Sequence, residues 1–321
     1  MKLSPRCLRS LTGLIPLVVA TAWPAHAQAT YTFGTGANEF SMAFVRIGDE
    51  GNLPDTTGAP NPAGAVPYRF WMGKYEVSED MINKAIAGGL TGVSMSPTRG
   101  PNKPATGMSW VEAARLVNWL NTSTGHQPAY SFDVNGNFQL WSSAEAWQSG
   151  GENLYRHKDA YFVLPNDHEW YKAAFYDASA GVYYDYSTGS DTPPTPVAYG
   201  TDPGTAVYFT FEGGPADITT AGGLSPYGTM GQGGNVWEWL ESALDEGNDD
   251  PAEYRALRGG NWWYNEDMMA SSFRHANLPQ EGQEGDDFGF RVALVPEPWH
   301  SASVMGAVAL GFGLWRRRGA R

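Results

Sequence analysis

Three stretches of the chain combine a helix-start signal with apolar residues at helical spacing. In the clearest of them, Ser109 and Glu112 form a capping box, in which the serine bonds forward and the glutamate bonds back. The apolar residues that follow at i, i+3, i+4 and i+7 are Ala113, Leu116, Val117 and Leu120. This spacing predicts a helix with one buried face.

The other two stretches predict shorter helices. Ser78 opens the first, and Gly88-Gly89 ends it. Its predicted buried face consists of Met81, Ile82, Ala85 and Ile86. Asn166 caps the second. The residues that it is expected to turn inward are Trp170, Ala173 and Ala174.

Between the second and third predicted helices, the pattern becomes typical of a β-hairpin. Asn135-Gly136 separates two runs rich in aromatic and apolar residues, 130–134 and 137–141, and Asn-Gly is a strong turn signal. Elsewhere in residues 28–295, short apolar runs alternate with Gly and Pro, and no linker or repeat divides them. We therefore expect one loop-rich domain of the α+β class over 28–295.

Composition indicates how such a domain is stabilised and which partners it avoids. The chain has 13 Trp and 16 Tyr, which bury large surfaces where regular structure is sparse. Its one cysteine, Cys7, lies near the N-terminus, so the domain must rely on its core. The net charge is −13, and seven basic residues lie in the two end segments, so the domain itself is more acidic still. This acidity argues against nucleic acid and anionic lipid surfaces as partners.

Residues 1–27 have the pattern of a secretory signal peptide. A basic start precedes a mostly apolar run at 11–22, and Ala25-His26-Ala27 is a small-x-small cleavage site. We expect signal peptidase to cut after Ala27, and the alternative is an uncleaved N-terminal anchor.

Residues 296–321 form a second targeting pattern. Pro296-Glu297-Pro298 is followed by an apolar run at 301–315 and then by Arg316-Arg317-Arg318. The run is marginal for a membrane span, which needs about 20 residues, and arginines favour the cytoplasmic side. This tail resembles the PEP-CTERM sorting signal of Gram-negative bacteria, which an exosortase processes. The resemblance implies transient anchoring in the inner membrane and a final place at the cell surface or outside the cell. A plain tail anchor is the alternative.

Six short motifs occur in order between about residues 45 and 294. They occupy residues 72–78, 104–120, 164–174, 233–239, 257–262 and 288–291. Among them are Gly-Gly-Asn-Val-Trp-Glu-Trp at 233–239 and Gly-Phe-Arg at 289–291. Together they resemble the formylglycine-generating (sulfatase-modifying factor) family. The resemblance implies a variant of the C-type-lectin-like fold with little regular secondary structure.

The best-known members of this family are oxidases, and this chain departs from them at the metal site. Their two cysteines follow the Arg-Gly-Gly segment and bind copper, a metal that soft thiolates suit. Here Tyr264 and Met269 fall near those positions, and no cysteine is present. We therefore expect no copper and no catalytic residues of that kind. Met268 and Met269 are interpreted as core filler rather than as thioether ligands.

The family also binds calcium around its Gly-Asn-Val-Trp-Glu segment. The resemblance implies one calcium ion held by the carboxylate of Glu238 and the carbonyls of Gly234 and Val236. The family's upstream Asp or Asn falls at Gly231, so one side-chain ligand is missing.

The surface that hosts the active site in the oxidases would here combine aromatic, amide and charged side chains. Its residues would be Trp262, Trp263, Tyr264, Asn265, Asp267, Arg274, His275 and Asn277. Aromatic faces beside amides and a carboxylate suit a sugar or a peptide. We therefore predict a non-catalytic binding module for a peptide or carbohydrate ligand. The alternative explanation of the two tryptophans is simple burial.

Two other functions stay open. The first is an oxidoreductase with a different metal site, in which His275 and one of Asp267, Asp286 or Asp287 would be ligands. The spacing of these residues carries no known metal signature. The second is a structural component of a surface matrix, which only the tail supports.

Overall fold

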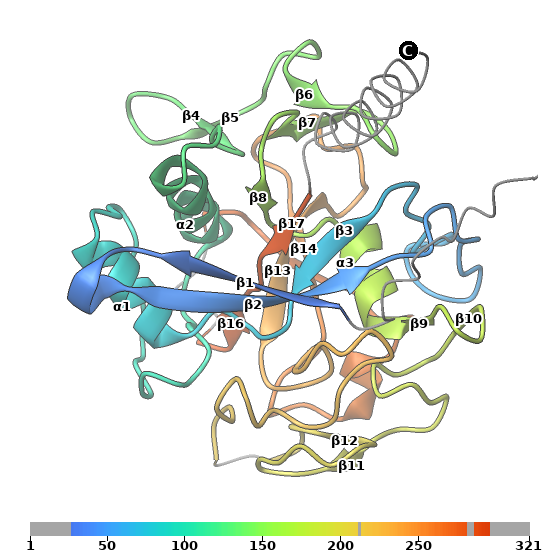
Figure 1. The fold of residues 1–321 in the computed structure, drawn as a ribbon. Helices are drawn as coiled ribbons and strands as arrows, with labels where there is room; N and C mark the ends of the chain where they lie inside the picture. Colours follow the sequence, from blue (N-terminus) through green and yellow to red (C-terminus); the bar gives the residue numbers. More distant parts are fainter. Residues whose placement is uncertain (1–26, 211–212, 281–285, 296–321) are drawn as a thin grey trace, which may run out of the picture.

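Two β-sheets and three α-helices organise the described residues of the computed structural model, which are 27–210, 213–280 and 286–295 (Figure 1). The predicted sorting tail and all but the last residue of the predicted signal peptide lie outside them, so both segments stay predictions. Within the described residues, no helix is both long enough and apolar enough to span a bilayer.

The larger sheet brings the two ends of the domain together. Its strands are antiparallel neighbours in the order β1 (Gln28–Phe33), β2 (Phe40–Ile47), β3 (Phe70–Gly73), β17 (Ala293–Leu294) and β8 (Phe162–Val163). In the register, Val45 faces Met72, and Met72 faces Ala293. The last strand of the domain is therefore held between two earlier ones, beside β3 (Figure 1).

The second sheet is buried along its centre. Its order is β15 (His275–Asn277), β14 (Arg255–Arg258), β13 (Trp237–Ala243) and β16 (Phe288–Gly289), and only the β13–β16 pair is parallel. Every residue of β13 and β14 is buried, including charged ones. Because an unpaired buried charge is costly, each of these charged residues needs a partner inside the protein.

The three predicted helices are confirmed as α1 (Glu79–Ala87), α2 (Trp110–Ser123) and α3 (Asp167–Phe175). The predicted caps are present, and both α2 and α3 start with a capping box. The predicted buried faces of α2 and α3 are confirmed. On α1 the prediction is wrong for Ile86, which is 40% exposed, because the buried stripe of this short helix is narrow and ends at Ala85.

The predicted hairpin is confirmed, with shorter strands than expected. Its strands are β4 (Ser131–Phe132) and β5 (Phe138–Gln139), paired antiparallel. The Oδ1 of Asp133 accepts hydrogen bonds from the backbone N–H groups of Asn135 (2.9 Å) and Asn137 (2.8 Å). A loop organised by this carboxylate therefore replaces the tight Asn-Gly turn.

Short ribbons and loops make up the rest of the described chain. β6 (Ala146–Trp147) pairs with β7 (Asn153–His157), and β9 (Tyr176–Asp177) pairs with β10 (Val182–Tyr183), both antiparallel. β11 (Thr195–Pro196) and β12 (Thr205–Ala206) are parallel, and η1 (Gly36–Asn38) and η2 (Glu266–Met269) are 3₁₀ turns. The loop-rich α+β class is confirmed.

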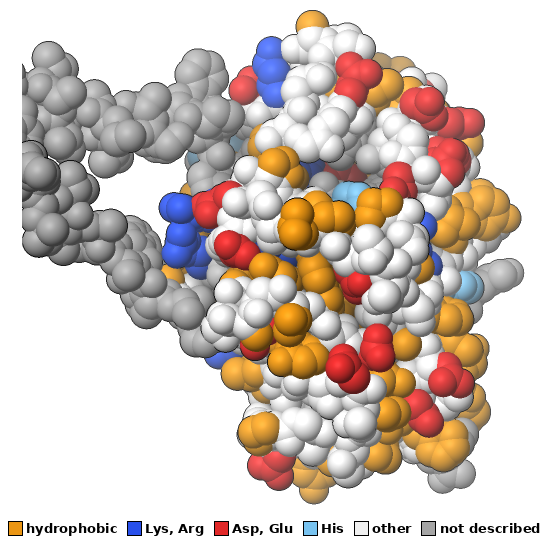
Figure 2. All heavy atoms as spheres, turned by 90° about the vertical axis from the view of Figure 1, so that its right-hand side faces the viewer, with side chains coloured by type: hydrophobic (Ala, Val, Ile, Leu, Met, Phe, Trp, Pro, Cys, Tyr) orange, Lys and Arg blue, Asp and Glu red, His pale blue; other side chains and the backbone are white. Residues whose placement is uncertain are grey.

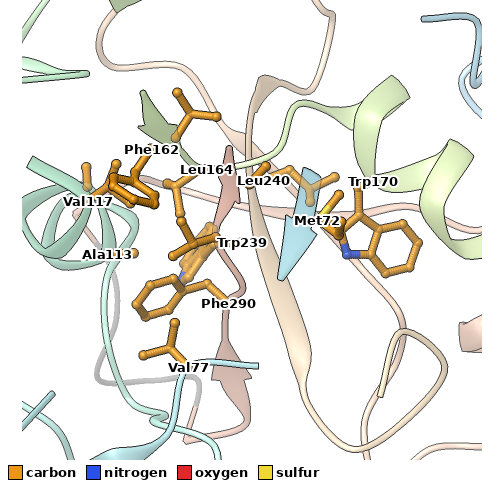
Figure 3. Close-up of a cluster of buried hydrophobic side chains, with 14 of the residues drawn as sticks. Met72, Val77, Ala113, Val117, Phe162, Leu164, Trp170, Trp239, Leu240 and Phe290 are labelled. Carbon is orange, nitrogen blue, oxygen red and sulfur yellow. The ribbon is translucent and has the colours of Figure 1, made fainter. Parts of the chain in front are cut away.

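The core lies between α2 and α3, which flank the central strands on opposite sides (Figures 1 and 3). Trp239 is fully buried, and its Nε1–H donates to the carbonyl of Met108 (2.9 Å). Figure 3 shows Trp239 near Phe290 and Leu164, with Val117 of α2 to one side and Trp170 of α3 to the other. Trp237 is 2% exposed and belongs to the same core. Truncating such a tryptophan typically costs about 3–5 kcal/mol.

Candidate ligand-binding face

The loop after β14 carries most of the predicted binding residues, and two glycines shape its start. Gly259 and Gly260 have φ angles of +96° and +70°, in the left-handed region that favours glycine. A Cβ at Gly260 would lie 2.9 Å from the Cγ of Met269. The glycine pair therefore lets the chain turn out of a buried strand against Met269.

Asn261 fixes the backbone of this loop from inside. Its Oδ1 accepts hydrogen bonds from the N–H groups of Trp263 (2.9 Å) and Tyr264 (3.0 Å), and its Nδ2 donates to Asp287. Asn261 is buried, whereas Trp263 and Tyr264 are 49% and 46% exposed. Asn261 was not among the predicted site residues, although an Asn that bonds the backbone two residues on is a recognised turn signal.

A distant segment lies beside this loop and adds a third aromatic ring. The N–H of Phe209 donates to the carbonyl of Tyr264 (3.1 Å), and the N–H of Thr210 donates to that of Trp262 (2.8 Å). Phe209 is 52% exposed. We call Phe209, Trp263 and Tyr264 the aromatic face. The sequence gives no signal for Phe209, because its place depends on a pairing between distant segments.

Trp262, which directly precedes Trp263, turns into the protein rather than to the surface. It is buried and packs in a small cluster with Val207 and Val236, among others. On its other side, the guanidinium of Arg99 lies 4.9 Å from the ring centroid, within cation–π range. Simple burial therefore explains Trp262, and it does not explain Trp263.

Two predicted polar residues follow directly in the same loop. Asn265 precedes η2, and its Nδ2 donates to the Oδ2 of Asp267 (2.9 Å). Asp267 is exposed, and Asn265 is partly exposed. An amide and a carboxylate thus stand next to the aromatic face in sequence.

Arg274 does not contribute to this face. Its Nε lies 2.7 Å from the Oδ2 of Asp167, and its side chain is only 13% exposed. Arg258 pairs with the other oxygen of the same carboxylate, as expected for a buried arginine of β14. Arg274 is thus held by a buried carboxylate, and its role as a ligand-binding residue stays a prediction.

His275 and Asn277 lie on β15, the edge strand of the second sheet, rather than in the loop. The His275 ring lies 5.3 Å from the Trp237 ring and 6.0 Å from the Phe288 ring. Burial on that side lowers the pKa of His275, although much of the residue is exposed. Asn277 uses its Oδ1 to accept the N–H of Leu278 (2.8 Å).

The predicted calcium ligand Glu238 has other partners. Its carboxylate accepts hydrogen bonds from Arg291 Nε (2.6 Å) and Nη2 (2.5 Å) and from Trp170 Nε1 (2.6 Å). A guanidinium in that place repels a divalent cation. The donor set of Glu238, Gly234 and Val236 therefore does not fit calcium well. Calcium stays a prediction of the resemblance, and this geometry disfavours it.

A second buried carboxylate faces the position where the family's upstream ligand is missing. A Cβ at Gly231 would lie 3.0 Å from the carboxyl carbon of Glu76. Glu76 accepts hydrogen bonds from the Nδ2 of Asn235 (3.0 and 2.8 Å). Burial, and then the charge of Glu238, raise the pKa of Glu76 well above its usual value.

Residues 33–295 match the family model of the sulfatase-modifying factor enzyme 1-like domain. The chain belongs to this family. Among solved structures, it is similar to Treponema denticola variable protein 1, with 21% identity and a TM-score of 0.58 over 84% of this chain and 99% of that one. It is also similar to CarF, with 19% identity and a TM-score of 0.51 over 71% of this chain and 87% of that one. At these identities the likeness shows the fold alone. No curated protein matches the chain.

The two residues predicted to fall near the copper-binding cysteines of the sulfatase-modifying factor oxidases are a surface residue and a core residue. Tyr264 belongs to the aromatic face, and Met269 is 2% exposed and packs with Tyr186 and Tyr208. Met268 packs against the main core. The interpretation of both methionines as core filler is confirmed.

The alternative metal site of this sulfatase-modifying factor domain finds no support in the geometry. Asp286 pairs with Arg99, and Asp287 accepts a hydrogen bond from Asn261. Burial raises the pKa of Asp287. Among the residues that the structure describes, no three His, Cys, Asp or Glu side chains gather as metal ligands.

Proposed function

We propose that this sulfatase-modifying factor domain is an exported, non-catalytic binding module that takes a peptide or carbohydrate ligand on its aromatic face. The observation that carries the proposal is the exposure of Phe209, Trp263 and Tyr264, each about half, from two hydrogen-bonded segments. Large aromatic side chains dominate the energetics of interfaces, and tryptophan and tyrosine are enriched there.

The chemistry of the face suits both ligand classes. The rings can stack on the C–H face of a sugar or on a peptide side chain, and Asn265 and Asp267 supply hydrogen-bond donors and acceptors. Asn261 holds the backbone of Trp263 and Tyr264 before any ligand arrives. Tyrosine and tryptophan have few rotatable bonds, so ordering them on binding costs little entropy.

The net charge of the molecule indicates which ligand charge it favours. The chain carries a net charge of −13, and Figure 2 shows acidic side chains spread over one face of the domain. Asp267, next to the aromatic face in sequence, is also acidic. A neutral or basic ligand therefore suits this protein better than an acidic one.

Substitution of Trp263 by alanine tests the proposal. The purified protein is incubated with a glycan array and with a peptide array, and the array that gives signal identifies the ligand class. We expect Trp263→Ala to weaken that binding by about tenfold or more, as for a central aromatic residue of an interface.

Tyr254→Ala is the matched control. Tyr254 is 50% exposed, like Trp263, but precedes β14 at the opposite end of the strand from the loop. Binding should be unchanged in this variant. An equal loss in both variants, or no signal on either array, would contradict the proposal.

A further inference from the structure

A polar pocket lies beside the start of α3, and none of its lining residues belongs to the aromatic face. Its volume is about 270 Å³. The polar side chains that line it include Asn166, the N-cap of α3, and His168 of α3. The others used here are Glu152, Ser242 of β13, and Glu246 and Asn248 from the loop after β13. At about 30 Å³ for each water, the pocket has room for roughly nine waters.

Two of these side chains are each anchored at one atom and leave a second polar atom unused. The Oδ1 of Asn166 accepts the N–H of Glu169 (2.8 Å), so its Nδ2 carries two hydrogens with no partner among the described residues. The Nδ1 of His168 accepts the N–H of Gly64 (3.1 Å). In the neutral ring, the proton of His168 is therefore on Nε2.

Ser242 and Asn248 are also anchored at their oxygen atoms and keep unused donor hydrogens. The Oδ1 of Asn248 accepts the N–H of Ala243 (2.7 Å), and the Oγ of Ser242 accepts the N–H of Asp167 (3.0 Å). Asn248 and Ser242 are 7% and 5% exposed, so their positions are fixed. The amide hydrogens of Asn248 and the hydroxyl hydrogen of Ser242 have no acceptor within the described part of the chain.

Glu246 adds an acceptor to these donors. Its carboxylate lies 3.9 Å from the Nε2 of His168 and 3.9 Å from the Nη2 of Arg274, beyond hydrogen-bond distance in both cases. The Nη2 of Arg274 is itself buried without a hydrogen-bond partner among the described residues. The side chain of Glu246 is one-third exposed, so the carboxylate can accept hydrogen bonds from a ligand.

The pocket presents both hydrogen-bond donors and acceptors, and this mixture determines which ligand charge it suits. The N–H groups of Asn166, Asn248 and His168 disfavour a cation, and the carboxylates of Glu246 and Glu152, which both line the pocket, repel an anion. A hydroxyl group donates one hydrogen bond and accepts two, so it can bind both the N–H donors and the carboxylate acceptors of the pocket. We propose that this pocket binds one neutral sugar unit or a polyol of similar size. This inference is independent of the aromatic face.

Titration calorimetry of the purified full chain with neutral monosaccharides tests the proposal. The probes are glucose, galactose, mannose and N-acetylglucosamine, each up to about 10 mM, to detect a Kd near about 1 mM. Glu246→Gln keeps the shape of the side chain and removes its charge, and Glu246 holds no other side chain by a hydrogen bond. We expect this variant to bind the preferred sugar at least about tenfold more weakly.

Two further variants complete the test. Asp249→Asn changes an acidic residue of the same loop that does not line the pocket, and it should bind like the wild type. Trp263→Ala should also bind the monosaccharide normally, whatever it does to the ligand of the aromatic face.

Three results would overturn the proposal. They are no binding of any monosaccharide, equal binding by wild type and Glu246→Gln, and binding only of charged probes such as glucosamine or inorganic phosphate. Loss of sugar binding in Trp263→Ala but not in Glu246→Gln would instead assign the sugar to the aromatic face.

Discussion

At the scale of single residues, buried carboxylates are neutralised by buried arginines in ion pairs. Arg291 meets Glu238, Arg258 meets Asp167, and Arg156 lies between Glu169 and Glu241. All of these side chains are almost completely buried. A loop-rich domain without disulfides gains a defined arrangement from such buried ion pairs, since a misplaced buried charge is strongly unfavourable.

The ion-pair role of Glu238 makes a prediction about both stability and calcium. Glu238→Gln should lower the free energy of unfolding by about 3–5 kcal/mol, because it leaves the buried guanidinium of Arg291 without a countercharge. Urea denaturation at pH 7 measures this change. Calcium should alter the melting temperature of wild type and variant equally. A calcium-dependent rise confined to the wild type would restore Glu238 as a calcium ligand.

At the scale of elements, helices can be predicted from local sequence signals, whereas the pairing of strands in the sheets cannot. The capping box of Ser109 and Glu112 lies within four residues, so the start of α2 can be predicted from the sequence. The pairing of Ala293 with Met72 joins distant segments and has no local signature. The same contrast holds at the candidate site. Trp263 can be predicted because it directly follows the motif at 257–262, whereas the place of Phe209 depends on a pairing between distant segments.

The docking of α3 makes a prediction about pH. Lys172 is buried on α3, and its Nζ donates to the carbonyl of Asp49 (2.7 Å). Burial lowers the pKa of Lys172 from 10.5 to about 8. Between those two pH values the unfolded chain binds more protons than the folded one, so the stability contributed by this group rises with pH.

Lys172→Met should remove that pH dependence. Relative to this variant, the wild type should gain up to about 3 kcal/mol of unfolding free energy between pH 7 and pH 10.5, at 1.36 kcal/mol per pKa unit. Denaturation of both proteins at the two pH values gives the difference. Lys84→Met, on the more exposed helix α1, is the control and should show a much smaller change, because Lys84 pairs with Asp80 at the surface. A constant gap between wild type and Lys172→Met would contradict the prediction.

At the scale of the whole molecule, the described strands and helices lie between the two predicted targeting segments. β1 begins at Gln28, which pairs with Val45, directly after the predicted signal-peptidase site. β17 ends at Leu294, before the Pro-Glu-Pro sequence at 296–298. Cleavage at both predicted sites would therefore remove no strand, helix or core residue of the described fold. The sequence alone suggests both sites, but only the register of the five-stranded sheet shows that the domain would keep all its strands.

Processing at both ends is the prediction that follows for the intact protein. Export across the inner membrane, a pause at the apolar run 301–315 and cleavage by an exosortase should leave the acidic domain at the cell surface or outside. Mass spectrometry of the mature protein should show an N-terminus at Gln28 and loss of the segment after about residue 298. Glu297→Ala within Pro-Glu-Pro should abolish the second cleavage and leave the first intact. Full-length protein that retains Arg316–Arg321 in a cell with a working exosortase would mean that the tail is an ordinary membrane anchor, and the domain would then stay attached to the inner membrane.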